Sequence, residues 1–184
     1  MLRSKVHVTL SVASFFVLAP ALGWAQETDL DDLFDNLATV GPDAAQAIEQ
    51  RIWREWSKSG SPSLDFLLDR GRAARESEEP ARAVEHLTAL IDHAPGFAEA
   101  YNLRATAYFQ QGLYGPSLED IRSALALNPR HFGAMSGLGL ILEELGYPED
   151  ALAAWREVIA LHPNQQGAAE AVARLERAVE GTAL

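Results

Sequence analysis

The feature that most constrains the fold of this chain is a repeat of 34 residues. Pro95, Pro129 and Pro163 each end a similar apolar segment, and successive prolines in this series are 34 residues apart. A fixed period of this length is typical of stacked supersecondary units, each of which buries its apolar face against its neighbours. The chain is therefore expected to fold as an array of like units.

The apolar positions within each unit have helical spacing. In the first unit these positions are Leu67, Gly71 and Ala74 in one half and Ala83, Leu87 and Leu90 in the other. The i, i+4, i+7 pattern predicts one amphipathic helix in each half. Gly112 and Gly146 suit the left-handed residue that ends a helix, and Pro148 suits the first turn of the helix that follows. Each unit is thus predicted to be a helical hairpin.

Residues 64–165 resemble three consecutive tetratricopeptide repeats (TPRs), with units at 64–97, 98–131 and 132–165. The middle unit carries the resemblance best, through Tyr101, Ala105, Tyr108, Gly112, Ser117, Ile121, Ala124 and Pro129. The first unit departs from the pattern, since Glu78 stands where the turn glycine would be. The resemblance implies an all-α fold, a right-handed solenoid of helical hairpins. It says less about function, because the residues that TPRs share are packing residues.

Two flanking segments are expected to complete the solenoid. Residues 167–180 are amphipathic and are predicted to cap the last repeat of a TPR domain at 62–184, because a solenoid exposes apolar surface at its end. Residues 26–61 keep the large residues of the repeat, but Leu37 and Glu49 stand where small ones recur. We expect helices at about 28–39 and 43–58 that stack on the first repeat as a degenerate unit. A plain N-terminal cap would give the same helices.

Two tryptophans of this N-terminal segment allow two interpretations. Trp53 and Trp56 fall on the apolar positions of the repeat, which favours a place in the core. An exposed aromatic anchor for a partner is the alternative.

The first 25 residues have the order of a secretory signal. Arg3 and Lys5 precede an apolar run from Val6 to Leu18, and small residues follow before Gln26. This order predicts export by the general pathway, with cleavage after Ala25 and a periplasmic location. An uncleaved N-terminal anchor is the alternative.

Composition narrows the function classes further. The chain has 15 basic and 26 acidic residues, a net charge of −11, and no cysteine. Disulfides, thiolate metal sites and a cysteine nucleophile are therefore excluded, and an acidic chain is a poor match for nucleic acid. The histidines lack the close spacing of metal ligands. The sequence predicts no catalytic residues, no metal site and no cofactor.

A binding role would lie on the concave face, which the resemblance assigns to the first helix of each unit. The positions concerned are Asp65, Leu68, Arg72, Arg75, Glu99, Asn102, Thr106, Phe109, Gly133, Ser136, Leu140 and Glu143. Family members that clamp a peptide carboxylate use lysines and asparagines there, and these positions include no lysine. The face instead predicts a mixed apolar and polar groove, either open or filled by the flanking helices. The partner-binding residues predicted from this face are Leu68, Arg72, Arg75, Asn102, Thr106, Phe109, Ser136 and Leu140.

These observations predict a non-enzymatic adaptor or scaffold of the bacterial periplasm that binds a peptide or helix of a partner protein. The acidic surface favours basic or neutral partners. No nucleic-acid partner is expected, and no membrane contact once the signal is cleaved. The alternative is a structural subunit tethered to the inner membrane by an uncleaved N-terminal segment.

Overall fold

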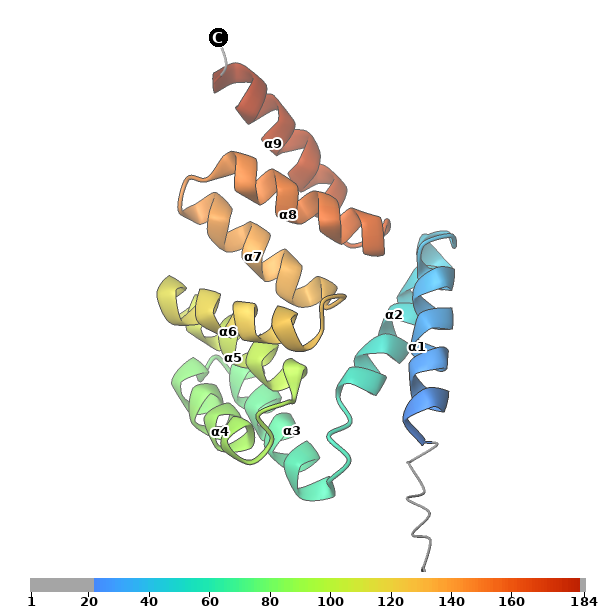
Figure 1. Ribbon diagram of the computed structural model, residues 1–184. Coiled ribbons are helices and arrows are strands. Elements are labelled where there is room, and N and C mark those ends of the chain that lie inside the picture. Colours follow the sequence, from blue (N-terminus) through green and yellow to red (C-terminus); the bar gives the residue numbers. More distant parts are fainter. Residues whose placement is uncertain (1–21, 183–184) are drawn as a thin grey trace, which may run out of the picture.

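A computed structural model describes residues 22–182, which contain nine α-helices and no strand (Figure 1). In chain order the helices are α1 (Leu22–Leu37), α2 (Pro42–Trp56), α3 (Pro62–Glu76), α4 (Pro80–His93), α5 (Ala98–Gln110), α6 (Tyr114–Leu127), α7 (Phe132–Glu144), α8 (Pro148–Leu161) and α9 (Ala168–Thr182). The predicted signal segment lies mostly outside the described residues. None of the helices described combines the length and apolar character that a membrane span requires.

The repeat boundaries follow from proline and from residues with a left-handed backbone. Proline occupies the first position of α3, α4 and α8, where its missing N–H costs nothing. Gly112 (φ +71°) and Gly146 (φ +77°) make the turns inside the second and third repeats. Glu78 makes the equivalent turn of the first repeat with φ +58°, a conformation that disfavours a side chain with a Cβ atom.

Small residues let the two helices of each repeat approach closely. A Cβ atom added at Gly71 would lie 2.6 Å from Leu87 Cγ, and one at Gly139 would lie 2.7 Å from Trp155 Nε1. In the middle repeat, the Ser117 hydroxyl donates a hydrogen bond of 2.8 Å to the carbonyl of Ala105. The pairs α3–α4, α5–α6 and α7–α8 are the three predicted hairpins, and the predicted all-α TPR solenoid is confirmed.

The last helix closes the C-terminal end of the array. Ala168, Ala171 and Leu175 of α9 are buried against Trp155 and Val158 of α8. The opposite side of α9 is polar, and Arg174 pairs with Glu143 of α7 at 2.6 Å. The helix therefore covers the apolar surface that the third repeat would otherwise expose.

The N-terminal hairpin forms, but the prediction that it stacks on the first repeat is wrong. Helix α2 makes almost no contact with α3. Figure 1 shows α1 and α2 beside the column of repeats, reaching from the level of α8 down to α3. Leu37 fills the position where a regular repeat has a small residue, and it is fully buried inside the hairpin. The hairpin therefore has a core of its own, and that core packs against Phe132 at the start of α7.

Candidate protein-binding cleft

Two neighbouring cavities open on the side of the repeats that α2 faces. The larger, of about 670 Å³, lies between the end of α2 and helices α3 and α5. The smaller, of about 150 Å³, lies between α5 and α7 and has a mainly apolar lining. Asn102, Thr106 and Gly133 border both cavities, so the two form one continuous cleft.

Seven of the eight residues predicted for partner binding border this cleft. Arg72 and Arg75 line the larger cavity, whereas Phe109, Ser136 and Leu140 line the smaller one. Asn102 and Thr106 lie at the junction. The role of these seven residues in partner binding stays a prediction.

The prediction of Leu68 as a cleft residue is wrong. Its side chain is 1 % exposed and belongs to the core between the first and second repeats, together with Leu87 and Leu103. An apolar side chain at this position gains more by packing against α4 and α5 than by facing solvent, because burial of apolar surface drives folding.

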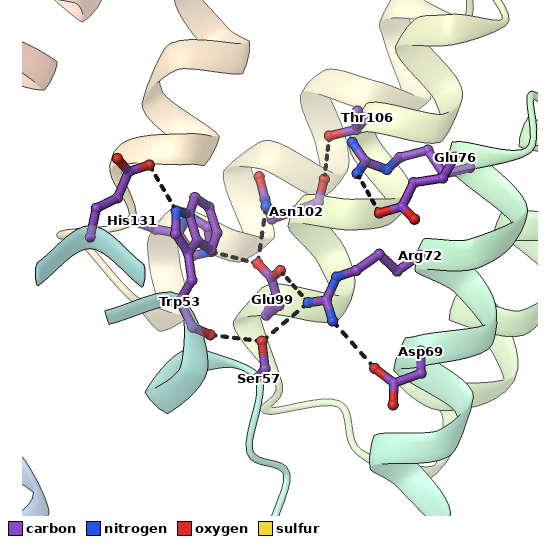
Figure 2. A network of polar contacts seen from close by, with 11 residues as sticks. Trp53, Ser57, Asp69, Arg72, Glu76, Glu99, Asn102, Thr106 and His131 are labelled. Carbon is purple, nitrogen blue, oxygen red and sulfur yellow. Dashed lines mark hydrogen bonds and ion pairs between the residues drawn. The ribbon is translucent and has the colours of Figure 1, made fainter. Parts of the chain in front are cut away.

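A buried carboxylate organises the wall of the larger cavity (Figure 2). Glu99, in the first turn of α5, is only 2 % exposed. Its Oε2 accepts a hydrogen bond of 3.0 Å from Asn102 Nδ2 and lies 3.1 Å from His131 Nε2. Its Oε1 lies 3.4 Å from Arg72 Nη2. A buried carboxyl group of this kind is tolerated because each of its two oxygens has a polar partner.

The tautomer of His131 follows from its second contact. Its Nδ1 accepts a hydrogen bond of 3.2 Å from the backbone N–H of Ala134, which makes His131 the N-cap of α7. In the neutral ring the proton is therefore on Nε2, from which it is donated to Glu99. The TPR resemblance placed Glu99 on the concave face but not among the predicted binding residues, because one more carboxylate in an acidic chain has no distinguishing pattern.

The contacts of Glu99 restrict what the neighbouring residues can offer to a partner. The amide nitrogen of Asn102 donates to Glu99, and the hydroxyl of Thr106 donates to the carbonyl of Asn102. Arg72 is held by Glu99, by Asp69 at 3.3 Å and by the Ser57 hydroxyl at 3.1 Å. Arg75 is less engaged, since its buried Nε has no hydrogen-bond partner among residues 22–182 and its Nη2 lies 3.9 Å from Glu76.

The cleft is less acidic than the chain as a whole. The larger cavity is lined by the cations Arg54, Lys58, Arg72 and Arg75 and by the anions Asp65, Asp69 and Glu99. All three anions have partners within the chain. Glu99 contacts Arg72, Asn102 and His131, Asp69 pairs with Arg72, and Asp65 accepts hydrogen bonds from Ser59 that lower the pKa of Asp65. The prediction of basic or neutral partners rests on the net charge of the whole chain and stays a prediction, whereas the charges that line this cavity are nearly balanced.

The two tryptophans of α2 pack against the start of α7, as their apolar spacing predicts. The Trp56 ring stacks on His131 with centroids 4.3 Å apart, and Trp53 meets the edge of Phe132 at 5.3 Å. Trp53 also lines the larger cavity. The hairpin thus closes one end of the cleft and leaves the rest open. The groove is therefore partly filled by a flanking helix, which lies between the two alternatives that the sequence allowed.

Comparisons with known proteins support the fold that the sequence implied. A tetratricopeptide repeat family model matches residues 68–116 and 114–166. A TPR repeat-containing protein of Rhizobium etli is 36 % identical over 153 residues, which cover 83 % of this chain and 75 % of that protein. The small glutamine-rich tetratricopeptide repeat-containing protein 2 of Saccharomyces cerevisiae is 27 % identical over 117 residues, 64 % of this chain but only 34 % of that protein.

A solved structure has the same arrangement of helices. The first TPR of Spaghetti (RPAP3), bound to an HSP90 peptide, superposes with a TM-score of 0.61 and 24 % identity, covering 64 % of this chain and 93 % of that one. At this identity the likeness shows the fold. Taken with the extent of the family match, it leads to one conclusion: the chain belongs to the tetratricopeptide repeat family.

Proposed function

We propose that this protein is a non-enzymatic adaptor of the bacterial periplasm that holds a segment of a partner protein in the cleft between α2, α3, α5 and α7. The observation that carries the proposal is the pair of joined cavities, one mainly apolar and one charged, which meet at Asn102, Thr106 and Gly133. The order of charged, apolar and small residues in the first 25 positions supports export.

The size of the smaller cavity favours a side chain over a whole ligand. Small-molecule sites are typically about 300–1,000 Å³, and this cavity is well below that range. A single apolar side chain of a partner would bury itself against Phe109 and Leu140, in the manner of the anchors that dominate protein interfaces. The Spaghetti domain binds a peptide of its partner, which supports the same mode here.

The larger cavity would then bind a charged side chain of the partner next to that anchor. Arg75 and Arg72 stand on its α3 wall and are partly exposed. We expect the partner segment to carry an acidic residue beside its apolar anchor. Hydrogen bonds between guanidinium and carboxylate are charge-assisted and directional, so they fix the register of the bound segment.

Partner capture from periplasmic extract tests this function with a matched pair of variants. Leu140 and Leu127 are both 44 % exposed, but only Leu140 borders the cleft. Leu140→Ala is expected to reduce capture of the partner severalfold, and Leu127→Ala to leave it unchanged. Equal capture of the partner by both variants would show that the smaller cavity is not part of the binding site.

The location has a separate test. Protein isolated from the cell envelope is expected to begin at Gln26. A start at Met1 would support the tethered subunit instead.

A further inference from the structure

The N-terminal hairpin is attached to the repeats through a small and specific surface. Its core consists of Leu33, Phe34, Leu37, Ala45 and Ile52, and within this cluster the repeats contribute one buried residue, Phe132. The hairpin is therefore a unit of its own that docks on the solenoid. The acceptor surface includes His131, Phe132 and Gly133 at the start of α7, His162 at the end of α8, and Arg130, which pairs with Asp31 of α1 at 2.7 Å and lies over the Phe34 ring.

Gly133 fits this surface to the indole of Trp53. A Cβ atom added at Gly133 would lie 2.6 Å from Trp53 Cη2 and 3.1 Å from Cζ2. Real Cβ contacts are longer than this, so a larger residue would push the ring away. Gly137, one turn later on the same helix, is different, because its added Cβ would meet Ile121 Cδ1 at an ordinary 3.5 Å.

Polar contacts fix the orientation of the docked hairpin. The Trp53 indole N–H donates a hydrogen bond of 3.1 Å to Glu49, one turn earlier on α2, and the other oxygen of Glu49 lies 3.4 Å from His162 Nε2. Asn164 Nδ2 donates a hydrogen bond of 2.9 Å to the carbonyl of Val40, at the turn of the hairpin. The surface thus recognises a carboxylate and two aromatic rings in a set order along one helix.

We infer that the start of α7 and the end of α8 form a second interaction surface, which accepts an aromatic helix and is occupied in cis by the chain's own α2. The helix that fits it carries two tryptophans three residues apart and a glutamate one turn before the first. The docking holds through these contacts, so it does not depend on the covalent linker at 57–61. The surface can therefore exchange its own hairpin for the same hairpin of a second copy.

The linker contains a single lysine, at which cleavage can test whether the docked hairpin stays bound without the covalent connection. The chain has two lysines, Lys5 and Lys58, and the exposed Lys58 lies between α2 and α3. A lysine-specific protease would therefore cut between the hairpin and the repeats and leave every repeat intact. Size-exclusion chromatography and native mass spectrometry would then show whether the hairpin fragment stays with residues 59–184.

We expect the cut wild-type protein to retain the fragment. Gly133→Ala is expected to weaken retention by about tenfold or more, because the added methyl overlaps the indole, whereas Gly137→Ala retains the fragment as the wild type does. Circular dichroism checks that both variants keep their helices. Immediate loss of the fragment from the wild type, or equal retention by both variants, would overturn the inference.

Two further measurements separate direct contact from general loosening. Trp53→Ala removes the ring that the Gly133→Ala methyl would strike, so the two changes together should cost less than the sum of their separate effects. Mixing cut protein with isotope-labelled cut protein should give hybrids by native mass spectrometry. Additive losses, or the absence of hybrids, would contradict the inference. Both readouts are independent of partner capture, so failure here leaves the proposed function standing.

Discussion

The Oε2 atom of Glu49 lies 3.4 Å from Nε2 of His162 and joins the N-terminal hairpin to the last repeat. The hydrogen bond with His162 holds the pKa of Glu49 below its ordinary value of 4.5, with a smaller contribution from the Trp53 indole, while partial burial opposes the shift. A carboxylate whose pKa is lowered on folding stabilises the folded state in its ionised form.

This contact predicts a specific loss of stability in acid. The stabilisation from Glu49 is complete above pH 4.5, where the carboxylate is ionised in both states, and is lost as the pH falls through the lowered folded-state pKa. Urea unfolding between pH 3 and 6 should therefore show Glu49→Gln less stable than the wild type at pH 6 and close to it at pH 3. Glu85→Gln, at an exposed site of α4, serves as the control. A difference that stays constant with pH would contradict the assignment.

The bidentate pair between Arg104 and Asp120 should be the costliest ion pair to break. Arg104 Nε and Nη2 lie 2.7 and 2.8 Å from the two oxygens of Asp120, which is nearly buried. Arg104→Ala would leave that carboxylate unpaired, and we expect a loss of about 3 kcal/mol in the free energy of unfolding. Urea denaturation measures the loss. Arg122→Ala, which breaks a pair of fully exposed side chains, should leave the midpoint unchanged.

The left-handed turn at Glu78 predicts a stabilising substitution. Its φ of +58° is strained for a residue with a Cβ atom, and glycine occupies the matching turns at Gly112 and Gly146. Glu78→Gly should therefore raise the free energy of unfolding by about 0.5–1 kcal/mol, since the relief of strain exceeds the entropy that glycine adds to the unfolded chain. Thermal unfolding measures this change. Gly112→Ala should move the melting temperature the other way, and a lower melting temperature for Glu78→Gly would refute the argument.

The repeats could be predicted from the sequence because their determinants are local and recur. The close approach at Gly71 depends on Leu87 in the same unit, and the 34-residue period repeats that relation. The resemblance to TPRs, which assigns the first helix of each unit to the concave face, places seven of the eight predicted binding residues on the cleft, and Leu68 is the exception. Helical spacing places Leu68 on a face that borders both the cleft and α4, and only packing decides between the two.

The docking of the hairpin could not be predicted in this way. It depends on the match between Trp53 and Gly133, which lie in segments far apart in the chain and occur once. The place of Glu99 among Arg72, Asn102 and His131 likewise arises only in the folded chain. Such single long-range contacts leave no periodic trace, so the sequence indicates the hairpin but not its position.

The close contact at Gly139 gives the sharpest test of the packing inside a repeat. An added Cβ would lie 2.7 Å from Trp155 Nε1, and this indole donates a hydrogen bond of 2.8 Å to Glu143. Gly139→Ala must displace the ring or separate α7 from α8, at a cost of about 1–3 kcal/mol. We expect a lower melting temperature and a red shift in Trp155 emission, measured in a Trp24→Phe, Trp53→Phe and Trp56→Phe background that leaves Trp155 as the one tryptophan of the sequence. Ser136→Ala on the same helix provides the control, because the Ser136 hydroxyl donates its hydrogen bond to the carbonyl of Phe132 in the preceding turn of α7. An unshifted spectrum with an unchanged melting temperature would show that the repeat tolerates a wider spacing than its glycine indicates.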